Sequence, residues 1–163
     1  MVVRPDDFRA DKHGVYSHAG DMGLIAWNMA KSALAELLPL ATEVRALAGI
    51  PGAGKTTWIG QHGIEGVLYF DSTLSMRKNR RDICAMASAA GRPIDCVFLD
   101  TDLQVCLARN RERSPDRQVP ESSIRRAHRR LTLCPPATDE GWRAVLRVEA
   151  VMGRVLDRVG RDL

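Results

Sequence analysis

The sequence lacks the features of secreted and membrane-embedded proteins. No apolar run approaches the roughly 20 residues of a membrane-spanning helix, and residues 1–20 carry charges throughout instead of an apolar signal-peptide stretch. The four cysteines show no C-x-x-C spacing, and the four histidines show no metal-ligand spacing. We therefore expect a cytoplasmic protein without a membrane partner, whose cysteines are reduced core thiols.

Composition indicates one globular domain. A chain of 163 residues with 45% apolar and 27% charged residues is long enough to bury a core. The net charge of +4 is modest, yet arginines crowd one segment. Two interpretations stay open for that segment, a solvated helix face or a site for phosphates, because guanidinium groups pair well with phosphate oxygens. Its arginines are Arg109, Arg111, Arg113, Arg117, Arg125, Arg126, Arg129 and Arg130.

The most informative stretch is GIPGAGKTT at Gly49–Thr57, which matches G-x-x-x-x-G-K-[ST] in full. It follows an apolar run at Val44–Ala48 and precedes a helix start at Thr57, as a phosphate-binding loop requires. Its backbone N–H groups would surround the phosphates of a nucleoside triphosphate. Lys55 would reach the β- and γ-phosphates, and the Thr56 hydroxyl would bind Mg²⁺. The predicted nucleotide-binding residues of the loop are Gly49, Pro51, Gly52, Ala53, Gly54, Lys55, Thr56 and Thr57.

Strands and helices alternate along the chain, which predicts an α/β fold with a parallel sheet covered on both faces. Expected strands are 1–4, 44–48, 66–70 and 94–99; expected helices are 21–38, 57–62, 77–90, 103–109 and 120–131. Asp21 and Asp102 are the predicted helix caps. The stretch 141–163 has no assigned type. Polar clusters follow several strands, so they should converge on one rim of the sheet.

Beyond the loop, the strand ending in Asp-Ser-Thr at 71–73, the CLARNRER segment and R-x-VPE resemble the 5′-hydroxyl polynucleotide kinases and their small P-loop kinase relatives. The resemblance covers most of residues 44–140. It implies a three-layer P-loop kinase fold with an arginine-rich lid. It also implies ATP or another NTP as phosphate donor, Mg²⁺ as cofactor, and 5′-hydroxyl ends of DNA or RNA as acceptor.

One departure from the family pattern concerns the order of segments. The family places a strand and a D-D-[YF]-R motif between the phosphate-loop helix and the Asp-Ser-Thr strand, but only Trp58–Val67 separates them here. The motif RPDDFR stands instead at the N-terminus, followed by a helix of suitable length. A circular permutation accounts for both facts; the alternative is an ordinary acidic turn and a lost substrate segment. The predicted divisions of the single domain 1–163 are an acceptor unit (1–43), a phosphate-loop core (44–108), a lid (109–134) and a C-terminal segment (135–163).

The resemblance assigns roles to further residues. Asp6 is the implied general base for the acceptor hydroxyl, with its neighbour Asp7 left open, and Arg9 is the implied partner of an acceptor phosphate. Asp71 and Thr73 are implied substrate-site residues, and Asp71 would also hold Mg²⁺ through a water. Arg113 is the implied arginine finger of the lid, Arg117 a weaker nucleotide-binding candidate, and Arg109 a candidate for either the lid or a structural pair with a carboxylate.

Two other functions remain open at this stage. One is a small-molecule P-loop kinase acting on a nucleoside, sugar or antibiotic hydroxyl; the other is an ATPase switch without an acceptor. Tyr16 and His18 are candidates for base stacking or for loop packing. Trp58 is expected in the core, Asp100 and Asp102 at a strand end and helix cap, and the arginine pairs at 125–126 and 129–130 on a solvated or nucleic-acid-facing surface rather than a catalytic one. Oligomeric state does not follow from the sequence.

Overall fold

The computed structural model describes residues 1–10, 21–151 and 154–156, and it has the predicted α/β architecture. Its strands are β1 (Val2–Val3), β2 (Glu43–Ala48), β3 (Val67–Asp71), β4 (Ile94–Thr101), β5 (Ala144–Val151) and β6 (Arg154–Leu156). Its α-helices are α1 (Met22–Leu37), α2 (Lys55–His62), α3 (Arg77–Ala89), α4 (Leu103–Arg111) and α5 (Glu121–Leu133). Short 3-10 helices are η1 (Pro5–Phe8), η2 (Leu38–Leu40), η3 (Pro115–Arg117) and η4 (Thr138–Glu140).

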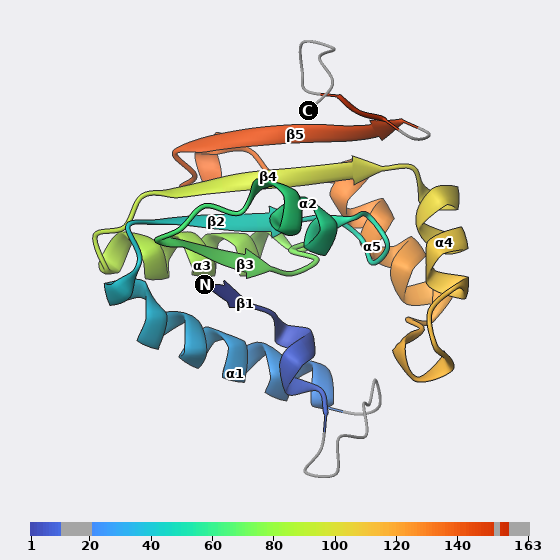
Figure 1. The fold of residues 1–163 in the computed structure, drawn as a ribbon, viewed down its shortest axis with the longest axis horizontal. Coiled ribbons are helices and arrows are strands. Elements are labelled where there is room, and N and C mark those ends of the chain that lie inside the picture. Colours follow the sequence, from blue (N-terminus) through green and yellow to red (C-terminus); the bar gives the residue numbers. More distant parts are fainter. Residues whose placement is uncertain (11–20, 152–153, 157–163) are drawn as a thin grey trace.

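The strands form one sheet in the order β1-β3-β2-β4-β5-β6. The first five are parallel, and β6 pairs antiparallel with β5. Figure 1 shows α2 on one face of this sheet and α3 on the other, and α4 and α5 beside the carboxyl ends of β2 and β4. The fold class predicted from the sequence is confirmed, and the segment left without a type at 141–163 contributes β5.

Burial on both faces explains why the central strands are continuous apolar runs. All five residues of β3 are buried, as are Ala46, Leu47 and Ala48 at the end of β2. Polar groups on either face would lose their hydration, whereas each large apolar side chain contributes about 1.5–3 kcal/mol when removed from water. The ends of these strands are therefore held in the core, and the loops that follow them start from fixed positions.

The two predicted helix caps differ in what their side chains do. Asp102 accepts hydrogen bonds from the backbone N–H groups of Gln104 and Val105, over 2.7 and 3.3 Å, so its capping role is confirmed. Asp21 stands at the N-cap position of α1, but its side chain makes no capping hydrogen bond. α1 is held instead by its packing, in which Leu34 is fully buried and Trp27 contacts Phe70 edge-on at 5.7 Å.

A buried ion pair fixes the loop after β3. Arg80 of α3 donates from Nε and Nη2 to the two carboxylate oxygens of Glu140, each over 2.6 Å, and both side chains are almost fully buried. Arg80 Nη1 also donates to the carbonyl of Leu74, which has φ of +46°. A left-handed conformation is costly for leucine, so it persists because this bond and the buried Leu74 side chain impose it.

The N-terminal strand lies where a permuted chain needs it. β1 pairs parallel with β3 at the sheet edge, and the Met1 amino group donates to the carbonyl of Val67, at the start of β3, over 3.1 Å. The N–H of Thr42, which follows η2, donates to the carbonyl of Gly66 over 2.9 Å. Both ends of the 1–42 unit therefore lie beside the short link between α2 and β3.

Within the described residues, no helix is long and apolar enough to cross a bilayer. The described cysteines carry no disulfide: Cys84, Cys96 and Cys106 are buried and Cys134 is partly exposed. Burial raises the pKa of the Cys84 thiol to about 12 and that of Cys106 to about 11. These are the reduced core thiols expected from the sequence.

Candidate active site

The phosphate loop adopts an open backbone cradle between β2 and α2. Gly49, Gly52 and Gly54 all have positive φ, at 153°, 88° and 96°. A Cβ on Gly52 would lie 2.6 Å from the carbonyl oxygen of Cys106, and one on Gly49 would lie 2.8 Å from that of Leu99. Glycine is therefore required at both positions for conformation and for space. The cradle at the start of α2 has the shape and the donors for a phosphate chain.

Lys55 lies within the loop and is partly buried. Its Nζ donates to the carbonyls of Gly49 and Ile50, over 3.0 and 3.3 Å. Burial lowers the pKa of this amine below its ordinary value of 10.5, opposed by the charges of Asp71 and Asp6 and reinforced by Arg113. A cation held by two carbonyls in a desolvated position gains from an anion placed beside it, which is what a bound triphosphate supplies.

Asp71 at the end of β3 links the phosphate loop to the N-terminal strand. Its Oδ2 accepts from Thr56 Oγ1 over 2.9 Å and from Arg4 Nε over 3.3 Å, and its side chain is 6% exposed. Among the described residues, no three His, Cys, Asp or Glu side chains are close enough to hold a metal by themselves. Mg²⁺ keeps several waters and binds through one hydroxyl or carboxylate and the phosphates of a nucleotide, and the Thr56 hydroxyl and the Asp71 carboxylate are groups of that kind.

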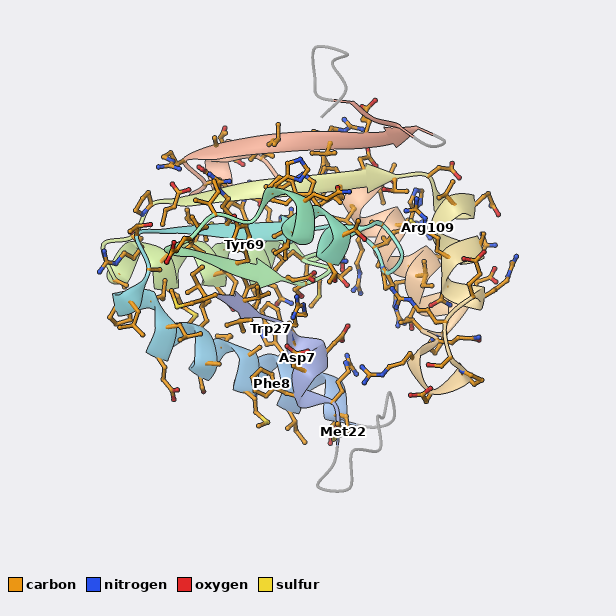
Figure 2. The ribbon with its side chains drawn as sticks, in the orientation of Figure 1. Asp7, Phe8, Met22, Trp27, Tyr69 and Arg109 are labelled. Atoms are coloured by element: carbon orange, nitrogen blue, oxygen red, sulfur yellow. The ribbon has the colours of Figure 1, made fainter. Side chains whose placement is uncertain are left out.

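On the other side, η1 carries the DDFR motif at the end of β1. Asp6 Oδ1 accepts from Arg9 Nε over 3.0 Å, and Asp6 remains exposed. Asp7 instead lies 3.8 Å from Arg4 and lines none of the three cavities described next. Figure 2 shows Asp7 and Phe8 on η1, with Arg109 on α4 across the view from them. The neighbouring residues Asp6 and Asp7 thus face different surroundings, and Asp6 is the carboxylate that lines the cavities.

Three cavities run in series along this rim. The donor cavity, of about 440 Å³, is lined by the phosphate loop, Trp58, Gln61, Leu99 and Val148. The middle cavity, of about 190 Å³, shares Lys55, Thr56 and Arg113 with it. The acceptor cavity, of about 320 Å³, shares Asp6, Arg9 and Thr73 with the middle one and no residue with the donor cavity. The polar clusters predicted to converge on one rim do so.

The lid arginines behave differently from one another. Arg113 lines both the donor and the middle cavity, and within the described chain its guanidinium has no hydrogen bond or ion pair. Arg109 donates from Nη1 to the Gly52 carbonyl over 3.0 Å, so its structural partner is the phosphate loop and not a carboxylate, correcting that alternative. Arg117 lies 3.6 Å from Asp116 and lines none of the three cavities.

Sequence reasoning overlooked several lining residues. Arg4 directly precedes the DDFR motif, and its position at a strand end was an available signal. Arg126 and Arg130 were expected on a solvated or nucleic-acid-facing surface, but they line the acceptor cavity, and their spacing of four residues on α5 was an available signal that they share a face. Gln61 and Val148 line the donor cavity without any motif to mark them.

The remaining candidates have structural positions. Trp58 is buried as expected and stacks on His62 at 4.7 Å, and its Nε1 has no hydrogen-bond partner. Asp100 forms an ion pair with Arg147. The carboxylate of Asp102 accepts hydrogen bonds from the backbone at the start of α4. Tyr16 and His18 lie outside the described residues.

Comparisons with known proteins agree with the fold. A family model described as an AAA domain matches residues 61–134, which run from the end of α2 to the end of α5. No curated protein matches the chain. Two crystal structures of the AvrRxo1-ORF1 and AvrRxo1-ORF2 complex are similar in fold, one native and one with sulphate ions. Their TM-scores are 0.55 and 0.54 at 11% and 12% identity, over 96% of this chain and 74% of theirs.

At such low identity the solved structures support the fold alone. The loop geometry and the family match indicate a P-loop nucleotide-binding domain of the NTPase and kinase-like type. Which molecule accepts the phosphate is a separate question, taken up from the residues of the acceptor cavity.

Proposed function

We propose that the protein is an ATP-dependent kinase that transfers the γ-phosphate to 5′-hydroxyl ends of DNA or RNA. The observation that carries this proposal is the series of three cavities. A nucleotide site and a site containing an arginine and an exposed carboxylate meet in a middle cavity lined by Lys55, Thr56, Arg113 and Asp6. An ATPase without an acceptor has no use for the second site.

The donor half would hold ATP by known physical means. The backbone cradle and Lys55 would bind the phosphates, and Lys55 would regain a favourable environment for its charge. Mg²⁺ would be held by Thr56 with Asp71 through a water, and it would neutralise charge on the phosphates. Arg113, whose guanidinium faces both the donor and the middle cavity, would stabilise charge on the transferring phosphoryl group.

The acceptor half would supply the base. The acceptor oxygen attacks the γ-phosphorus, a new P–O bond forms, the bond to the β-phosphate oxygen breaks, and ADP leaves. The hydroxyl proton goes to the Asp6 carboxylate, which is exposed and oriented by Arg9. Arg9 and Thr73 would position the acceptor beside it.

A second candidate is a small-molecule kinase of the same type. An acceptor cavity of about 320 Å³ is within the range of sites that bind small ligands, so a nucleotide-sized hydroxyl compound would also fit. The two candidates differ in salt response, because contacts with several phosphates of a polynucleotide release several counterions.

The test measures transfer of labelled γ-phosphate from ATP to a 5′-hydroxyl oligonucleotide, with nucleosides, nucleoside monophosphates and sugars as parallel acceptors. The proposal predicts transfer to the oligonucleotide with an acceptor KM that rises steeply between low and moderate salt. Transfer only to a small acceptor, with a flat salt response, would favour the second candidate. ATP binding without transfer to any acceptor would contradict both.

A further inference from the structure

The face of α5 that closes the acceptor cavity carries two arginines without acidic partners. Ser123, Arg126, Ala127 and Arg130 recur at helical spacing and line the cavity opposite Asp6 and Arg9. Among the described residues, Arg126 has one side-chain bond, from Nη2 to Ser123 Oγ over 3.3 Å, and Arg130 has none. Neither arginine forms an ion pair within the described chain, whereas Arg125 on the same helix pairs with Glu121.

The charge balance of the cavity favours an anion. Among the described residues, its lining holds three guanidinium groups, from Arg9, Arg126 and Arg130, and one carboxylate, from Asp6, which already accepts from Arg9. Like charges converging on one hollow repel each other and destabilise the free protein. A solvated helix face would let these side chains point apart, but here they line a common cavity. A bound dianion, or two successive phosphodiesters, would remove the repulsion and use the guanidinium forks.

The position of the cavity limits what that anion can be. The acceptor cavity shares no lining residue with the donor cavity, so the anion is not a phosphate of the bound nucleotide. It shares Asp6, Arg9 and Thr73 with the middle cavity, where the acceptor hydroxyl would react. The anion therefore belongs to the molecule that carries the hydroxyl, on the side away from ATP.

Resting on the proposed function, we propose that Arg126 and Arg130 form a subsite for a phosphate of the acceptor. The acceptor is thus a hydroxyl compound that already bears a phosphate ester, and α5 holds that phosphate while Asp6 faces the hydroxyl. In a polynucleotide this is a backbone phosphate on the 3′ side of the reacting nucleoside. In a small acceptor it is a phosphomonoester.

The test compares Arg126→Gln/Arg130→Gln, which removes two charges from the cavity, with Arg129→Gln, which removes one charge from the same helix outside the cavity. The double variant should raise the oligonucleotide KM at least tenfold and lower the salt slope of log KM by about 0.7, for one single-strand phosphate contact. Arg129→Gln should change the KM less than twofold, and ADP affinity measured for all proteins reports folding. Equal effects of the two substitutions on KM would overturn the subsite.

Acceptor length distinguishes the source of the phosphate. A nucleoside should be a poor acceptor for wild type and double variant alike. If wild type and double variant differ in KM for a nucleoside 3′-monophosphate, the subsite holds the phosphate on the reacting nucleoside. If they differ only for a dinucleotide or longer acceptor, the subsite holds the following phosphate. A nucleoside that is used as well as its phosphorylated forms would contradict the proposal.

A binding measurement keeps the subsite separate from the proposed function. Fluorescence anisotropy of a 3′-fluorescein, 5′-hydroxyl oligonucleotide needs no catalysis. Weaker binding by the double variant than by Arg129→Gln would support a phosphate subsite even if no transfer occurred and the kinase proposal failed. Transfer without any difference in binding or KM would retain the kinase and overturn the subsite.

Discussion

At the scale of single residues, the site is defined by how neighbouring groups are separated. Asp6 and Asp7 are adjacent in sequence, yet the 3-10 turn of η1 directs Asp6 to the cavities and leaves Asp7 near Arg4. The resemblance assigned the base to Asp6 but left Asp7 open, because the two neighbouring carboxylates are chemically alike. The direction of each side chain depends on the turn that Pro5 begins, and this is a property of the folded backbone.

Lys55 provides a prediction about protons. Burial lowers its pKa in the free protein, and bound phosphates should raise it again, because an opposite charge favours the ammonium form. At a pH between the two values the complex binds more protons than the free protein, so nucleotide binding should take up protons. Affinity should correspondingly fall as the pH rises through the pKa of the free protein.

Calorimetry of ADP binding over a series of pH values above the phosphate pKa of about 6, in buffers of different ionisation enthalpy, measures this uptake. Lys55→Arg is the matched control, since its guanidinium stays charged throughout and should show no uptake at this site. An equal number of protons for wild type and Lys55→Arg would show that Lys55 is not the titrating group.

At the scale of elements, the buried ion pair between α3 and η4 holds the loop that follows β3, which contains Thr73 and Leu74. Arg80 connects Glu140, the Leu74 carbonyl and the Cys134 carbonyl, so one side chain joins three segments. The hydrogen bonds and charge of Glu140 outweigh the burial that opposes the guanidinium, and they raise the pKa of Arg80. Removing one partner would leave an uncompensated buried charge.

Glu140→Gln should therefore lower the free energy of unfolding by about 3–5 kcal/mol. Asp139→Asn is the matched control: Asp139 precedes Glu140 in the same turn and pairs with Arg77, but its side chain is 66% exposed. Its loss should cost at most about 1 kcal/mol, as for other surface ion pairs. Urea unfolding measures both, and similar losses for the two variants would show that the buried pair does not hold the fold together.

At the scale of the whole molecule, the same sheet can be built from the segments in more than one chain order. Met1 lies beside Val67 and Thr42 lies beside Gly66, so the 1–42 unit enters and leaves the sheet next to the α2–β3 link. Parallel pairing keeps β1 beside β3 whichever segment precedes it in the chain. Such proximity of chain ends is the condition under which rearranged chains fold.

A rearranged gene tests this directly. The chain would begin at residue 43, run to 65, continue through a short Gly-Ser linker into 1–42, and return at 66–163. We expect this protein to unfold cooperatively, to bind ADP within about tenfold of the parent, and to retain transfer, since no packed element is displaced. A chain that binds no nucleotide would contradict the view that the N-terminal unit is a transposed part of one sheet.

Much of this architecture could be predicted because it is local. The phosphate loop, the central strands and the cap at Asp102 each follow from a few consecutive residues. The pairing of Arg80 with Glu140 spans 60 positions and depends on how α3 packs, so no local sequence pattern predicts it. The same holds for Arg126 and Arg130, whose function as cavity residues depends on which face of α5 meets η1, and for β5, whose pairing with β4 reveals a strand where the periodicity was ambiguous.

The central claim is that Asp6 accepts the proton of a hydroxyl that receives the γ-phosphate. The most direct measurement is label transfer from ATP to a 5′-hydroxyl oligonucleotide by Asp6→Asn and Asp7→Asn, with ADP affinity measured in parallel. The account predicts that Asp6→Asn loses at least about 10²-fold in kcat with ADP binding intact, while Asp7→Asn stays within severalfold of wild type. Equal activity of the two variants, or a greater loss in Asp7→Asn, would contradict it.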